Sequence, residues 1–130
     1  IAAAIATIEK MERESVITHI WRSGNQLMDG VETKIDMAGL SEQIQVYGDA
    51  CFARIKYSTP QIATLFRQEM ISSGTLIIAS HNLCYAHSQS ELERVYSSYD
   101  HALSVVADAV KLGDIDGRIN GTVAPTVRGA

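Results

Sequence analysis

Apolar residues recur at steps of three and four through the first forty residues, which predicts two consecutive helices. The first helix, residues 1–13, is alanine-rich and repeats its larger apolar side chains at helical spacing: Ile1, Ile5, Ile8 and Met11. Ser15 follows an interruption and is expected to cap the second helix, which ends near Gly39. That second helix is predicted to be roughly 35 Å long. Its apolar stripe consists of Val16, Ile17, Ile20, Trp21, Gly24, Leu27, Met28, Val31 and Ile35.

From residue 43 the hydrophobic period changes to two, which predicts an antiparallel hairpin. Ile44 and Val46 alternate with polar positions, and Gly48 with Asp49 turns the chain. The second strand places one set of side chains on each face: Cys51, Ala53, Ile55 and Tyr57 opposite Phe52, Arg54 and Lys56. The Arg54 and Lys56 face is either solvated or turned toward an anionic ligand.

A third helix is predicted to open at Pro60 and to stop at Gly74. The runs 75–78 and 83–86 are short and extended, with a loop at 79–82 between them. Ser88 and Glu91 then form a capping box, in which each satisfies a backbone donor at a helix start. The long helix that follows is expected to end at Gly113, and residues 114–130 have no period and are expected to be extended or disordered.

These elements predict an α+β fold: a small, mostly antiparallel sheet of three to four strands, with long helices packed on one face. Residues 1–40 form a helical connector, residues 41–113 a small α+β domain, and residues 114–130 a tail. The connector is long for a domain of this size, and the sequence opens at Ile1 directly in a helical pattern. We therefore expect the chain to be a piece of a longer polypeptide.

The composition and net charge exclude some classes of protein. The chain has 130 residues, 46% of them hydrophobic, which is enough for one globular core. A formal net charge of −4 offers no basic field for nucleic acid or an anionic membrane surface, and no apolar stretch is long enough to span a membrane. Cys51 and Cys84 lack CxxC spacing and favour a reducing, cytoplasmic setting in which they are small buried hydrophobes.

Residue chemistry alone leaves several alternatives open, because no nucleotide-binding, hydrolase or zinc-protease motif is present. His81 and His87 either converge on a ligand or act as packing and capping residues. Cys84 lies between Leu83 and Tyr85, where an apolar strand would bury it and keep it inert. A metal or thiol enzyme built on His81, His87 and Cys84 is the weakest hypothesis. The residues by themselves indicate an α+β domain that is not catalytic alone.

Residues 65–100, LFRQEMISSGTLIIASHNLCYAHSQSELERVYSSYD, carry a more specific pattern. Phe66, Met70 and Gly74 are similar to an F-x-x-x-M-x-x-x-G helix end, and residues 86–91 are similar to A-H-[ST]-x-x-[DE] at the start of a final helix. Together they resemble the C-terminal small domain of class-III pyridoxal-phosphate (PLP) aminotransferases, a family that includes the glutamate-1-semialdehyde aminomutases. Residues 79–85 resemble the loop of that family that faces the active site.

The resemblance implies the C-terminal domain of a fold-type I PLP enzyme. It implies a missing PLP-binding large domain, a homodimer, and a small amino or oxo substrate. The substrate-facing loop would contribute Ser80, His81 and Asn82, while His87, Ser88 and Glu91 would form a structural corner. In the aminomutases this loop tends to carry a glutamate and aromatic residues. Here it has no acidic residue, so aminotransferase and aminomutase both remain open.

The resemblance also implies that catalysis requires a lysine that this chain lacks. The family holds PLP as a Schiff base on a lysine of the large domain, and none of the lysines here lies in that motif: Lys10, Lys34, Lys56 and Lys111. We therefore expect no covalently bound PLP and no activity from the isolated chain. The alternative is a stand-alone α+β binding or dimerisation module. In either case, we expect residues 1–28 to expose apolar surface and to promote self-association.

Overall fold

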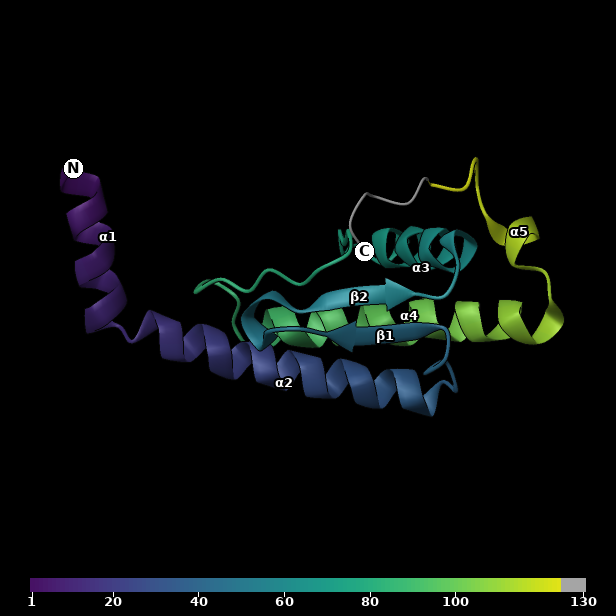
Figure 1. The fold of residues 1–130 in the computed structure, drawn as a ribbon, viewed down its shortest axis with the longest axis horizontal. Coiled ribbons are helices and arrows are strands. Elements are labelled where there is room, and N and C mark those ends of the chain that lie inside the picture. The colour runs from purple at the N-terminus through teal and green to yellow at the C-terminus, as the bar shows by residue number, and fades with distance from the viewer. Residues whose placement is uncertain (125–130) are drawn as a thin grey trace.

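The computed structural model describes residues 1–124 and places two long helices beside a short hairpin (Figure 1). The elements along the chain are α1 (Ala2–Arg13), α2 (Val16–Met37), β1 (Ile44–Tyr47), the 3-10 turn η1 (Ala50–Phe52), β2 (Arg54–Tyr57), α3 (Pro60–Ser72), α4 (Gln89–Leu112) and the one-turn α5 (Ile115–Arg118). The helices predicted up to residue 113 are therefore all present. The class is α+β.

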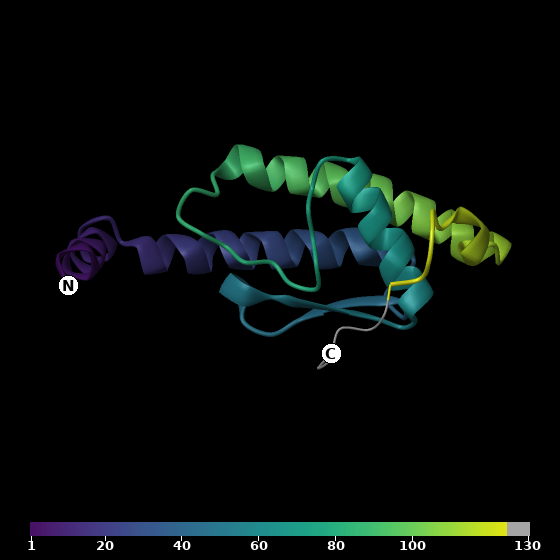
Figure 2. The same ribbon diagram turned by 90° about the horizontal axis from the view of Figure 1, so that it is seen from above.

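The two long helices, α2 and α4, lie side by side; α2 packs against β1 and η1, and α3 lies beside both β2 and α4 (Figures 1 and 2). Helix α1 projects away from this body at a steep angle to α2 and buries no residue. The change of direction occurs at Ser15, which adopts a left-handed conformation with φ 49°. Ser15 is the N-cap residue of α2, as predicted, but its side chain accepts no capping hydrogen bond.

The predicted sheet of three to four strands is wrong, because the described residues form only one two-stranded sheet, β1 with β2. The strands are antiparallel, with Ile44 opposite Tyr57 and Val46 opposite Ile55. Residues 75–78 form no strand, and two of their side chains, Leu76 and Ile78, are exposed instead of packed. Residues 83–86 are likewise irregular.

A third segment nevertheless follows the free edge of β2. The Ile55 N–H donates to the Ala79 carbonyl at 2.9 Å, and the His81 N–H donates to the Ala53 carbonyl at 2.7 Å. Only one isolated antiparallel bridge, between Arg54 and Ser80, results from these bonds. The segment is therefore fixed to the sheet edge over a few residues without becoming a regular strand.

The core lies between the helices and the inner face of the hairpin. The predicted stripes of α2, α3 and α4 and the inward positions of both strands supply most of it, including Leu27, Val31, Ile35, Ile44, Val46, Ile55, Leu65, Phe66, Met70, Tyr99, Leu103 and Val106. Because α2 contributes to this cluster, it packs as part of the same body as the hairpin. The division of the chain at residue 40 stays a prediction.

The helix ends follow the local sequence where it offers the right groups. The Thr59 hydroxyl accepts the Ile62 N–H at 3.2 Å at the start of α3, with Pro60 in the first turn. Gly39 and Gly113, just beyond α2 and α4, both have φ 69°, a conformation in which a side chain would be strained.

The predicted extended tail is partly helical, since α5 lies within it. The Gln68 side chain of α3 holds α5 in place. The Gln68 amide nitrogen donates to the Arg118 carbonyl at 3.0 Å, and the Gln68 amide oxygen accepts the Asn120 N–H at 2.7 Å. The rest of the predicted tail, residues 125–130, lies outside the described residues. Among residues 1–124, no helix has the length and apolar character needed to cross a membrane.

Candidate functional site

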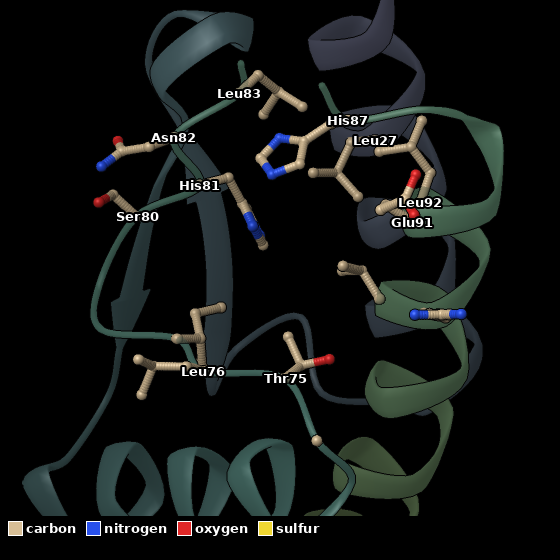
Figure 3. Close-up of a pocket in the computed structure, with 14 residues that line it drawn as sticks. Leu27, Thr75, Leu76, Ser80, His81, Asn82, Leu83, His87, Glu91 and Leu92 are labelled. Atoms are coloured by element: carbon tan, nitrogen blue, oxygen red, sulfur yellow. The ribbon is translucent and has the colours of Figure 1, made fainter. Parts of the chain in front are cut away.

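A pocket of about 330 Å³ lies between the loop that follows α3 and the first turns of α4 (Figure 3). It brings together most of the residues that the sequence singled out. The lining consists of Leu27, Gly74, Thr75, Leu76, Ile77, Ser80, His81, Asn82, Leu83, His87, Glu91, Leu92, Arg94 and Val95. The predicted loop and two residues of the predicted corner, His87 and Glu91, therefore line one cavity, whereas Ser88 is not in the lining.

The sheet edge determines how the loop presents its side chains. Successive residues of an extended segment point to opposite sides, so His81 points inward while Ser80 and Asn82 point outward. Figure 3 shows this arrangement, with the rings of His81 and His87 directed into the space between the loop and α4. Ser80 and Asn82 border the pocket, but their side chains point away from that space.

His81 is the buried polar group of this lining, with 8% of its surface exposed. Its Nε2 atom lies 2.8 Å from the hydroxyl oxygen of Tyr99, a residue of α4 that is completely buried. Burial lowers the pKa of His81 to about 4, so the ring is neutral at neutral pH. Tyr99 packs in turn against Phe66 of α3, with ring centroids 5.2 Å apart. The histidine is thus anchored to the core.

The corner before α4 is held by local hydrogen bonds. The His87 Nδ1 atom accepts the Cys84 N–H at 3.2 Å. The capping box predicted at Ser88 and Glu91 is present, and hydrogen bonds from Ser88 lower the pKa of the Glu91 carboxyl group. These contacts fix the direction in which the chain enters α4.

Sequence reasoning missed two contributors to this region. His19, a residue of α2, reaches across to the corner, where its Nε2 lies 3.3 Å from the His87 carbonyl oxygen. Its ring also meets that of Tyr85 edge-on, with centroids 5.1 Å apart. Arg94 lines the pocket one helical turn after Glu91, and that spacing was the only available signal.

Cys84 does not have the environment predicted for it. The residue lies in an irregular segment and is exposed, and Cys51 is half-buried. The prediction that Cys84 is buried is wrong, because residues 83–86 form no strand that would cover it. A metal site is not formed either, since residues 1–124 bring together no group of three histidine, cysteine, aspartate or glutamate side chains.

The pocket does not fit covalently held PLP, because that cofactor needs a lysine amine and no lysine is among the lining residues. Lys34, on α2, instead pairs with Asp100 of α4 at 2.6 Å. The other lysines, Lys10, Lys56 and Lys111, also lie outside the lining. None of the four lysines thus lies at this pocket.

No family model matches the chain. One solved structure has the same fold over most of it: the PLP internal aldimine form of the FumI protein from Sphingopyxis sp. MTA144. The TM-score is 0.75 and the sequence identity 22%, over 85% of this chain and 27% of that protein. The chain thus spans about a quarter of the length of the FumI chain. At this identity the likeness establishes the fold.

Proposed function

We propose that the chain is the C-terminal small domain of a PLP-dependent enzyme of the class-III aminotransferase type, similar to glutamate-1-semialdehyde aminomutases. The observation that carries the proposal is the fold that it shares with one quarter of a PLP-bound protein. The pattern in residues 65–100 supports it independently, because that pattern is read from sequence alone.

In this proposal the domain covers the cofactor cleft and orients the substrate. The loop with Ser80, His81 and Asn82 is the part that faces a small amino or oxo compound. Its attachment to β2 and the hydrogen bond between His81 and Tyr99 hold the loop in place, which suits a role in positioning. Covering a cleft in this way also excludes water from the reacting groups.

The cofactor and its lysine belong to a separate large domain. PLP, when bound, supplies an electron sink for carbanion chemistry. The residues of this chain would hold and orient the substrate beside it. The isolated chain is therefore inactive, and the complete enzyme works as a homodimer with the large domain as the immediate partner. The exposed isoleucines of α1, Ile5 and Ile8, fit a helix that the large domain or the second subunit covers.

A spectroscopic comparison tests this proposal. The 130-residue chain and the full-length gene product are each incubated with PLP and freed of unbound cofactor. We expect the visible absorbance of lysine-bound PLP in the full-length protein alone. Retained lysine-bound PLP, together with turnover of an amino donor, in the 130-residue chain would contradict the proposal.

The second candidate is a stand-alone α+β binding or dimerisation module, which the exposed apolar face of α1 also favours. Such a module would have no large domain encoded beside it and would show no PLP absorbance in any form. The same comparison therefore separates the two candidates.

A further inference from the structure

The hydroxyl of Tyr99 has a single hydrogen-bond partner among residues 1–124, the Nε2 atom of His81 at 2.8 Å. Tyr99 is completely buried, so its hydroxyl proton needs a protein acceptor. If Nε2 carried the ring proton, it would donate to the tyrosine oxygen and leave the hydroxyl proton unpaired in the core. Leaving a buried donor unpaired costs free energy. Tyr99 therefore donates, and Nε2 is the bare, accepting nitrogen.

The ring proton must then lie on Nδ1, because a neutral imidazole carries one N–H. Burial keeps the pKa of His81 near 4, so the neutral form dominates at neutral pH. Nδ1 makes no hydrogen bond to any residue that the structure describes, and it is not among the fully buried atoms without a partner. Since His81 lines the pocket, the wall carries an unpaired N–H donor (Figure 3).

The remaining lining adds one cationic donor and one carboxylate. Arg94 forms no ion pair within residues 1–124, so its guanidinium group is a second unpaired donor beside the pocket. Glu91, an acidic group of the lining, accepts hydrogen bonds from the backbone and hydroxyl of Ser88 on Oε2 alone, so among residues 1–124 its Oε1 atom is an acceptor without a partner. Leu92 and Val95 add apolar surface between these polar groups. Beside His81 and Arg94 the unpaired groups thus donate hydrogen bonds, and the Oε1 atom of Glu91 is the acceptor on the α4 side of the pocket.

We infer that the pocket binds the carboxylate or oxo end of a short aliphatic compound. An oxygen of that end accepts a hydrogen bond from His81 Nδ1–H, and the positive charge of Arg94 attracts it. A ligand that offers an ammonium group at that end finds no acceptor on His81. The inference rests on the proposed function, because the pocket concerned is the one assigned there to the amino or oxo substrate. Tyr99 acts as a positioning residue: it selects the tautomer of His81 without touching the ligand.

The tautomer can be measured directly in the 130-residue chain. In ¹⁵N-labelled protein, the couplings between the ring nitrogens and ring protons of His81 identify the protonated nitrogen. We expect Nδ1–H in the native chain and a shift of the population toward Nε2–H in Tyr99→Phe. A native chain with its proton on Nε2 would overturn the inference, whatever the variant does.

Ligand preference is tested with butanoate and butylammonium, which share one carbon chain and differ in the end group. We expect butanoate to bind at least about five-fold more tightly, the factor that one hydrogen bond provides. Tyr99→Phe and Arg94→Gln should each weaken butanoate about five-fold, whereas Arg22→Gln, on exposed α2 surface, should not. Equal binding of the two ligands to the native chain would contradict the inference.

Both readouts separate this inference from the proposed function, since neither needs PLP. Unchanged amide spectra show that the variants are folded, and the native chain alone decides the tautomer and the preference between ligands. Lysine-bound PLP in this chain would overturn the proposed function and leave the tautomer result standing. A His81 proton on Nε2, in a chain that holds no lysine-bound PLP, would overturn this inference and leave the proposed function in place.

Discussion

A β-carbon at Gly24 would stand 2.3 Å from the main-chain oxygen of Ala50, so helix α2 and the turn η1 approach each other more closely than any side chain would permit. Ala50 is buried, and it is followed by the residues that lead into β2. This contact therefore fixes the distance between α2 and the edge of β2, to which the loop with Ser80, His81 and Asn82 is bonded.

Gly24→Ala is expected to destabilise the fold by about 1–3 kcal/mol, because backbone must move to admit the methyl group. Chemical denaturation measures the change. Gly117→Ala in α5 is the control: nothing lies within 4 Å of its β-carbon, so we expect no comparable loss. A Gly24→Ala variant as stable as the native chain would contradict the close approach.

Burial of His81 makes stability depend on pH. Its pKa is about 4 in the folded chain, below the ordinary value of 6.5, so protonation favours the unfolded state. This contribution is complete above pH 6.5 and is lost as pH falls toward 4, up to about 3 kcal/mol. Carboxyl groups such as Glu69, whose pKa is lowered chiefly by a hydrogen bond from Gln68, also lose stability in acid.

The difference between the native chain and His81→Gln isolates the histidine from those carboxyl groups. Urea denaturation at a series of pH values is expected to show a native-minus-variant stability that declines between pH 6.5 and 4. A difference that stays constant over this interval would mean that His81 is not held neutral by burial.

The capping box at the start of α4 makes a separate contribution. Ser88→Ala removes the hydroxyl that pairs with Glu91 and is expected to destabilise the chain by about 1 kcal/mol. Ser97→Ala, at an exposed position later in the same helix, is the control and should be neutral or slightly stabilising. Thermal or urea unfolding compares the two variants. An equal change in stability for the two variants would show that the capping box does not stabilise the helix.

Helix α1 provides a prediction about association. Its isoleucines Ile5 and Ile8 are 52% and 57% exposed, and no residue of the helix is buried. We expect the chain to self-associate through residues 1–28 in sedimentation experiments, and Ile5→Ser with Ile8→Ser to reduce that association. Ile78→Ser, at an exposed position on the pocket loop, is the control. A native chain that sediments as a single monomeric species would contradict this prediction.

The helices could be predicted because their signals are local. The stripe that includes Leu27 and Val31, the glycines that follow α2 and α4, and the Ser88–Glu91 box each act within a few residues. The extra strands could not be predicted correctly, because a strand depends on a partner that the local pattern does not reveal. Residues 75–78 have β-branched character, but no strand lies beside them.

In the candidate site, too, the residues could be predicted from the sequence but their orientation could not. The sequence named Ser80, His81 and Asn82 together, and the structure separates them: His81 is buried against Tyr99, while the other two side chains point outward. Which of three neighbours faces inward depends on how the segment pairs with β2. His19 contacts His87 of the corner, and the two residues are 68 positions apart in the sequence. A local motif cannot indicate a contact over that separation.

The central claim is that this domain provides a wall for a cofactor whose lysine lies elsewhere. Borohydride reduction of the full-length gene product loaded with PLP, followed by peptide mass spectrometry, locates that lysine directly. We predict that the pyridoxyl group lies on a lysine outside the 130 residues. A pyridoxyl group on Lys10, Lys34, Lys56 or Lys111 would contradict the account.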